Sequence, residues 1–243
     1  MKLTGNKILI TGGASGIGLA MARRFVALGN RVIVTGRDRS KLAKLQQDLP
    51  QIHTFACDLA YEKELDELVL YLEKNHPDLN VLVNNAAIQY NYDFTDEKEL
   101  VYKIAYEVKT NLTAPLKLIG LLLPQLLHNP EPAIVNVSTG LIFAPKKSAA
   151  VYCGTKAGLH TFTKALRYQL EGKAKVFEVI PPLVDTPMTA GRGTGKIAPE
   201  QLVEEFVEAF RRDKCEISIG KTKLLRFLHR LAPSVADRIM KNK

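Results

Sequence analysis

The sequence predicts an α/β fold in which a doubly wound parallel sheet of about seven strands lies between two layers of helices. Two observations predict this fold. Short apolar segments with strand character alternate with helical patterns of ten or more residues along most of the 243-residue chain. A glycine-rich turn follows the first strand segment and leads directly into the first helical pattern, which is the order of a βαβ unit.

The expected elements follow from apolar periodicity and from the turn residues between segments. Strands are expected at residues 7–10, 31–35, 52–57, 80–83, 133–137, 174–180 and 216–219. Helices are expected at residues 17–28, 40–49, 62–75, 96–127, 149–170 and 199–211. Within the longest helix, Pro115 has no N–H to offer the carbonyl of Asn111, so we expect a kink there.

The composition limits the class of protein. A net charge of +9 hints at acidic partners, but the chain has no nucleic-acid-binding motif and no basic, aromatic-rich pattern, so nucleic-acid binding is not expected. The chain contains no uninterrupted run of about 18 apolar residues, so no membrane-spanning helix is expected. Cys57, Cys153 and Cys215 share no metal-ligand spacing, which predicts no metal site and fits a reducing cytoplasm.

The glycine-rich turn carries Gly12, Gly16 and Gly18 at G-x-x-x-G-x-G spacing, with Ser15 and Ile17 between them. Gly12 permits a tight turn, Gly16 lets a pyrophosphate approach the backbone, and Gly18 allows close packing of helix on strand. The following helix would point its first amides at the phosphates. The turn therefore predicts a dinucleotide site of the Rossmann type, with a plain strand–helix connection as the alternative.

The end of the second expected strand bears on the choice of cofactor. An Asp or Glu commonly holds the free ribose 2′-OH of NAD at this place, whereas this chain has Gly36-Arg37. An arginine can grip a 2′-phosphate with two hydrogen bonds, which favours NADP(H) over NAD(H). Because Asp38 is adjacent, binding of NAD(H) remains an alternative. A solvated loop position for Arg37 is the other alternative.

Tyr152 and Lys156 are the candidate reactive pair. They stand four residues apart on an expected helix, so their side chains share one face with Cβ atoms about 5–6 Å apart. A nearby ammonium lowers the pKa of a phenol from its usual value of about 10, which makes the phenol usable for proton transfer. The alternative is a Tyr and a Lys on an ordinary amphipathic helix.

Polar residues also follow the carboxyl ends of expected strands, where doubly wound sheets bind their ligands. Asp58, Asn84 and Ser138 occupy such positions. Turn and capping chemistry is the alternative for Asp58 and Asn84. The Ser138 hydroxyl, the Tyr152 phenol and the Lys156 ammonium would then lie together at one site.

The order of these motifs resembles that of the short-chain dehydrogenase/reductase family in its single-domain form. The resemblance covers residues 3 to about 190 and rests on Thr11-Gly12-x-x-x-Gly16-Ile17-Gly18, Asp58, Asn84-Asn85-Ala86, Asn111, Ser138, Tyr152-x-x-x-Lys156 and Pro181-x-x-Val184-x-Thr186. Residues 2–6, 185–187 and 219–225 are similar to the DltE-type oxidoreductases of that family. Ala87 and Pro182 depart from the family pattern, which has Gly at both positions, and Pro182 has no N–H for a cofactor contact.

The resemblance implies an oxidoreductase that moves a hydride between a nicotinamide cofactor and a carbonyl compound or secondary alcohol. Tyr152 would be the general acid/base, Ser138 would bind the substrate oxygen, Lys156 would hold the nicotinamide ribose, and Asn111 would position a water. The cofactor would contact Gly12, Ser15, Gly16, Ile17, Gly18, Arg37, Asp58, Leu59, Asn84, Ala86, Tyr152, Lys156, Pro181, Val184 and Thr186. In this set, Asp58 and Asn84 would face the adenosine and Thr186 the nicotinamide carboxamide.

We expect one domain over residues 1–243, with residues 187–212 as a lid over the substrate and residues 221–243 as a basic helical tail. A disordered loop is the alternative for the lid. For the tail, a solvated helix packed on the domain is favoured over contact with an anionic membrane surface. The resemblance also implies a homodimer or homotetramer. The alternative function is a cofactor-binding regulatory or cell-envelope-associated protein, whose link to teichoic-acid D-alanylation rests on the DltE name alone.

Overall fold

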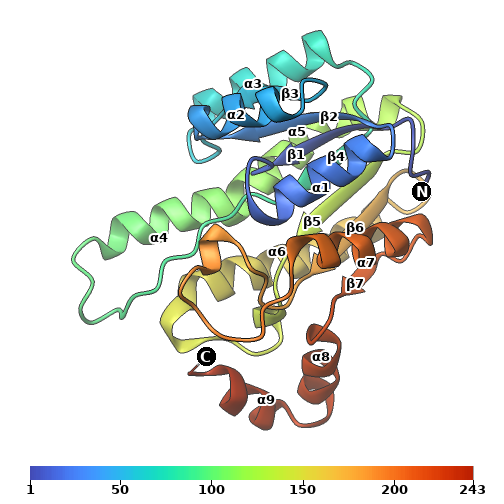
Figure 1. The fold of residues 1–243 in the computed structure, drawn as a ribbon. Coiled ribbons are helices and arrows are strands. Elements are labelled where there is room, and N and C mark those ends of the chain that lie inside the picture. Colours follow the sequence, from blue (N-terminus) through green and yellow to red (C-terminus); the bar gives the residue numbers. More distant parts are fainter. Residues whose placement is uncertain (243) are drawn as a thin grey trace.

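The computed structural model, which describes residues 1–242, contains a seven-stranded parallel sheet in the order β3-β2-β1-β4-β5-β6-β7 (Figure 1). The strands are β1 (Lys7–Thr11), β2 (Arg31–Gly36), β3 (His53–Ala56), β4 (Val81–Asn84), β5 (Ala133–Val137), β6 (Lys175–Ile180) and β7 (Glu216–Ser218). The chain moves outward from β1 to β3 and then returns to β4. The carboxyl ends of β1 and β4 therefore form the switch point at which such sheets bind ligands.

Helices cover both faces of the sheet, and the resulting three-layer arrangement confirms the predicted fold class. The helices are α1 (Gly16–Ala27), α2 (Arg39–Asp48), α3 (Glu62–Asn75), α4 (Leu100–Val108), α5 (Ala114–His128), α6 (Ala150–Gln169), α7 (Pro199–Arg211), α8 (Thr222–Leu231) and α9 (Pro233–Met240). Helices α1, α2 and α7 share one apolar core with the sheet, and α3, α5 and α6 share the other. Because both faces are covered, every residue of β1, β4 and β5 is buried.

Aromatic packing anchors α1 beside α7 at the side of the sheet that carries the glycine-rich turn. Phe25 of α1 meets Phe206 and Phe210 of α7 edge-on, with ring centroids 6.1 Å apart in both pairs. All three rings are fully buried, and each stabilises the fold by about 1.5–3 kcal/mol relative to an exposed ring. This packing fixes the position of α1, whose first turn borders the cavity described below.

The long helix in the middle of the chain differs from the expected one. It starts at Leu100, because residues 94–99 form turns instead. It is then interrupted at Lys109–Thr113 by a π turn, which places one extra residue in a single turn. The irregularity expected around Asn111 and Pro115 is therefore present, in the form of a π turn that joins α4 to α5.

The carboxyl-terminal tail forms α8 and α9, which pack on each other and against the loop after β5. Several of its apolar side chains are exposed: Leu224, Phe227, Leu231, Val235 and Ile239. Lys223 and Arg226 of α8 form ion pairs with Glu205 and Glu216. Lys243, the last residue of the expected tail, lies outside the described residues. Within residues 1–242, no helix combines the length and the apolar character needed to cross a bilayer.

Candidate active site

A cavity of about 870 Å³ opens along the carboxyl ends of the strands. Residues that directly follow β1 to β6 contribute to its wall, and so do α6, the segment after β6 and the tail helices. The sheet order sets the direction of the cavity, which runs from the ends of β3 and β2 past the glycine-rich turn to the ends of β5 and β6.

The glycine-rich turn between β1 and α1 has the backbone that a pyrophosphate requires. Gly12 and Gly16 have positive φ angles of 65° and 53°, which residues with a Cβ rarely adopt. A Cβ on Gly18 would lie 2.4 Å from the Gly12 carbonyl oxygen, so Gly18 allows the close packing that the sequence predicts. Ser15 makes no capping hydrogen bond with its side chain. The first amides of α1 therefore stay available to an anion in the cavity, which Ser15, Gly16 and Ile17 line.

A hydrogen-bonded chain joins Arg37 to Asp58 at the β2–β3 side of the cavity. Arg37 Nη1 donates to the Tyr106 hydroxyl at 2.7 Å, and this hydroxyl donates to Asp58 Oδ2 at 2.6 Å. Burial raises the pKa of Tyr106 to about 12, so the phenol keeps the proton that it donates. Leu59 and Gly36 also line this part of the cavity. Sequence reasoning missed Tyr106, because it lies 48 residues beyond Asp58 and no local motif marks it.

Asn84 lies behind the cavity wall, so the structure does not support its predicted contact with the adenosine. It is the last residue of β4, and its buried Nδ2 donates to Asn136 Oδ1 at 2.9 Å. The next residue, Asn85, lines the cavity instead, and its Nδ2 donates to the Thr11 carbonyl at 3.0 Å. Ala86 and Ala87 also line the cavity.

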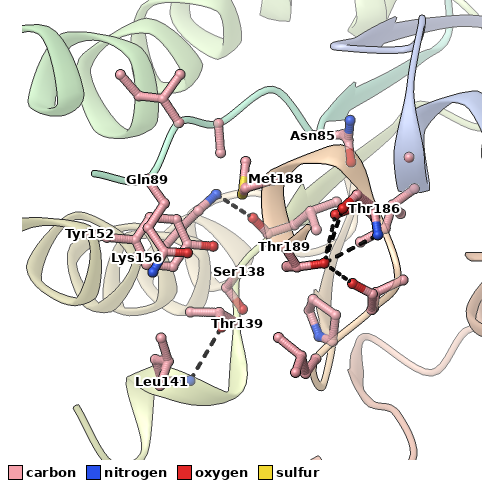
Figure 2. Close-up of a pocket in the computed structure, with 18 of the residues that line it drawn as sticks. Asn85, Gln89, Ser138, Thr139, Leu141, Tyr152, Lys156, Thr186, Met188 and Thr189 are labelled. Atoms are coloured by element: carbon pink, nitrogen blue, oxygen red, sulfur yellow. Dashed lines mark hydrogen bonds between the residues drawn. The ribbon is translucent and has the colours of Figure 1, made fainter. Parts of the chain in front are cut away.

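Tyr152, Lys156 and Ser138 meet at the β5–β6 side of the cavity. Figure 2 shows Tyr152 and Lys156 projecting from the same helix toward Ser138. Lys156 Nζ donates to the Val137 carbonyl at 2.7 Å, and burial lowers the pKa of Lys156 to about 8. Ser138 is 2% exposed, and its hydroxyl has only a long hydrogen bond of 3.4 Å to the Val179 carbonyl.

The lowering of the Tyr152 pKa that the Tyr-Lys spacing predicts is not found. Burial dominates and raises the pKa of Tyr152, while the Thr139 hydroxyl and the Arg192 guanidinium oppose this rise. Lys156 is not among the groups that shift the pKa of Tyr152.

Asn111 is fully buried in the π turn and does not line the cavity. Its side chain holds the backbone of Ile88: Oδ1 accepts from the Ile88 N–H and Nδ2 donates to the Ile88 carbonyl, each at 2.8 Å. Asn111 thereby fixes the segment after β4, from which Ala87, Ile88 and Gln89 line the cavity. Its role in positioning a water stays a prediction.

The segment after β6 forms the outer wall of the cavity. Its lining residues include Pro181, Pro182, Val184 and Thr186. Val184 pairs with Ile197 in an isolated β-bridge, so the two ends of the intervening segment are held together. A Cβ on Gly16 would lie 3.0 Å from Thr186 Cγ2, which places Thr186 across from the glycine-rich turn.

Three charged residues near Tyr152 were not singled out from the sequence. Lys146 and Arg192 line the cavity, and Glu107 is fully buried on α4. Burial raises the pKa of Glu107 to about 7. Only the folded structure brings these residues to one site, because they come from three separate segments of the chain. Among residues 1–242, no group of three or more His, Cys, Asp or Glu side chains is placed to hold a metal ion.

Comparison with known proteins agrees with this architecture. A family model described as short chain dehydrogenase matches residues 6–196. The chain is 42% identical over 233 residues to the uncharacterized oxidoreductase DltE of Bacillus subtilis (strain 168), with 93% of this chain and 92% of that protein covered.

Two solved structures share the fold over nearly their whole length. A short chain dehydrogenase from Burkholderia cenocepacia J2315 in complex with NADP has a TM-score of 0.88 at 20% identity, covering 100% of both chains. A short chain dehydrogenase/reductase from Burkholderia phymatum in complex with NAD has a TM-score of 0.87 at 17% identity, covering 100% of this chain and 97% of that one.

The family match spans the glycine-rich turn, the Tyr-Lys pair and the segment after β6, and the 42% identical relative extends the likeness into the tail. The chain therefore belongs to the short-chain dehydrogenase/reductase family.

Proposed function

We propose that the protein is an NADP(H)-favouring oxidoreductase that interconverts a carbonyl compound and a secondary alcohol, with Tyr152 as general acid/base. The observation that carries the proposal is one continuous cavity. The glycine-rich turn and Arg37 border one side of it, and Tyr152, Ser138 and Lys156 border the other. A dinucleotide needs a phosphate cradle and a reactive group within one such space.

The lining residues fit a dinucleotide. The amides at Ser15, Gly16 and Ile17 would hold the pyrophosphate, and Asp58 would contact the adenine end. Arg37 uses Nη1 to bind Tyr106, and its remaining donors would bind a 2′-phosphate. This arrangement supports NADP(H), with NAD(H) as the second option.

The remaining predicted contacts lie nearer the reacting end. Leu59, Ala86, Pro181, Val184 and Thr186 all line the cavity. Gly12 and Gly18 would act through the shape of the turn. We do not propose a contact from the side chain of Asn84.

The chemistry divides among three side chains. When bound, the nicotinamide supplies or accepts the hydride. In the reducing direction, the Tyr152 phenol donates its proton to the carbonyl oxygen, while the Ser138 hydroxyl donates a hydrogen bond to the same oxygen and stabilises its developing negative charge. Lys156 would hold the nicotinamide ribose from its place beside Tyr152 in the cavity wall, where its Nζ already donates to the Val137 carbonyl.

Other parts of the proposal follow from the position of the segments. Within the expected lid, residues 187–196 would be the part that moves, since they begin in the outer cavity wall and are bounded by the bridge between Val184 and Ile197. Helix α7, which makes up most of the rest of residues 187–212, is held in the core. We further propose a cytoplasmic homodimer or homotetramer in which the tail, residues 221–243, stays packed on the domain.

The test is a panel of aldehydes, ketones and secondary alcohols with NADPH, NADP, NADH and NAD, read by nicotinamide absorbance. We expect turnover of at least one carbonyl class, with higher kcat/KM for NADPH than for NADH. Tight cofactor binding without turnover of any carbonyl or alcohol would favour a regulatory role, and no cofactor binding would overturn the proposal.

A further inference from the structure

Lys146 and Arg192 are two of the cations that line the cavity, and the proposed cofactor contacts use neither. Lys146 comes from the loop between β5 and α6, and Arg192 comes from the segment after β6. Both line the cavity together with Tyr152. The charge of Arg192 opposes the rise that burial causes in the pKa of Tyr152, and it adds to the lowering that burial causes in the pKa of Lys146.

Neither cation has a carboxylate partner. No ion pair within residues 1–242 includes Lys146 or Arg192, whereas Lys196 on the same segment pairs with Asp185 at 3.2 Å. The Nη1 of Arg192 is buried without any hydrogen-bond partner, and Nη2 reaches only the Gln89 carbonyl, at 3.5 Å.

The buried carboxyl in this neighbourhood does not compensate the two charges. Glu107 accepts a hydrogen bond from the Tyr90 N–H, and burial, which disfavours its charged form, raises its pKa. Two cations that approach each other in a partly buried space repel, and each loses hydration. Such an arrangement is typical of a site that receives an anion.

The two cations do not belong to the phosphate cradle. Thr186, rather than Arg192, lies against Gly16 of the glycine-rich turn. The loop that carries Lys146 contacts α9 instead, because the Lys147 N–H donates to the Lys241 carbonyl at 3.0 Å.

Part of the cavity wall is apolar. Leu141, Leu224, Leu225, Leu228, Ile239 and Met240 line it, most of them from α8 and α9. A ligand in this cavity would therefore have two positive charges and a set of aliphatic side chains within the same space.

We propose that Lys146 and Arg192 form a carboxylate subsite, and that the substrate is an oxo acid or hydroxy acid with an apolar chain. The guanidinium of Arg192 would turn its unpaired Nη1 toward the carboxylate, and Lys146 would add a second charge-assisted hydrogen bond. The chain would lie against α8 and α9, and the reacting oxygen would lie at Tyr152 and Ser138. This substrate class rests on the proposed oxidoreductase function, but the subsite can be tested without turnover.

The binding test uses the full chain saturated with NADP and compares octanoate with octanamide by isothermal titration calorimetry. We expect octanoate to bind at least tenfold more tightly than its neutral analogue. Arg192→Met and Lys146→Met should each reduce this preference by about tenfold, because each removes one charge-assisted contact. Lys147→Met, which removes a neighbouring exposed charge, is the matched control and should keep the preference. Equal affinities for the two ligands, or a preference that survives both subsite variants, would overturn the subsite.

The kinetic test compares 3-oxooctanoate with 3-oxooctanamide as substrates with NADPH. We expect the ratio of their kcat/KM values to favour the acid and to fall toward one in Arg192→Met. Turnover of both substrates without preference for the acid would refute the subsite and leave the proposed function standing. Turnover of neither, with the octanoate preference intact, would leave the carboxylate subsite standing and refute the oxo-acid substrate class, and absence of turnover across the whole carbonyl panel would refute the function. If either variant weakened NADPH binding as much as octanoate binding, the pair would serve the cofactor and the proposal would fail.

Discussion

Replacing Glu107 by Gln should remove a pH-dependent penalty on stability. Glu107 is fully buried, its Oε1 accepts only a long 3.3 Å hydrogen bond from the Tyr90 N–H, and its Oε2 has no partner. Burial therefore raises its pKa from the usual value of 4.5 to about 7. A Gln has nearly the same shape and keeps an acceptor for Tyr90, so the substitution chiefly removes the ability to ionise.

The raised pKa fixes both the sign and the pH range of the effect. Below pH 4.5 the carboxyl is protonated in both folded and unfolded chains, so its ionisation does not affect stability. Between pH 4.5 and about 7 the unfolded chain releases this proton first, so stability falls as pH rises. Above about pH 7 the loss is complete and amounts to about 3 kcal/mol, since each pH unit between the two pKa values contributes about 1.36 kcal/mol.

The assay is urea unfolding of the wild type and Glu107→Gln at pH 5 and at pH 8.5. The free energy of unfolding of the variant relative to the wild type should rise by about 2–3 kcal/mol between these two pH values. Glu99→Gln, at an exposed position that precedes α4, is the control and should change by no more than about 0.5 kcal/mol. An equal stability difference at both pH values would refute the reasoning, because it would mean that Glu107 ionises with an ordinary pKa in the folded protein.

Three further predictions concern other parts of the molecule. Arg37→Asp should shift the kcat/KM preference from NADPH toward NADH by at least tenfold, because the carboxylate repels a 2′-phosphate and accepts from a 2′-OH; an unchanged ratio would show that Arg37 is not the selector. Asn111→Ala should lower the free energy of unfolding in urea by about 2–4 kcal/mol, because it leaves both backbone groups of Ile88 unpaired; a loss below about 0.5 kcal/mol would contradict that role. The double variant Phe227→Glu and Leu231→Glu should co-sediment with phosphatidylglycerol vesicles no less than the wild type; wild-type binding that the variant loses would show that the tail contacts membranes.

The sequence was sufficient for the sheet and for most of the cavity wall, because both depend on local signals. Buried parallel strands appear in a sequence as short apolar runs, and the residue after each run lies at the carboxyl edge of the sheet. For this reason Asp58, Ser138 and Tyr152 line the cavity as expected. The exception is Asn84. The side chain of Asn84 is buried because its Nδ2 donates to Asn136 on the neighbouring strand, and the next residue, Asn85, lines the cavity instead.

The remaining site residues depend on packing between distant segments. Tyr106 of α4 bonds to Arg37 and Asp58, which follow β2 and β3, and Arg192 and Lys146 line one cavity although they come from segments more than 40 residues apart in sequence. The direction of the Tyr152 pKa could not be predicted either. Residue spacing indicates which charges are near a phenol, but the dominant cause here is burial, which only the packed structure reveals.

The central claim is that the Tyr152 phenol transfers the proton while the cofactor transfers the hydride. The most direct test is Tyr152→Phe, which removes the hydroxyl and keeps the ring, measured with NADPH and the best carbonyl substrate of the panel. We predict that the NADPH dissociation constant changes by less than about threefold while kcat/KM falls by about 10²–10⁴-fold, the usual contribution of a general acid/base. A variant that binds NADPH normally and retains more than about a tenth of the wild-type kcat/KM would contradict the claim.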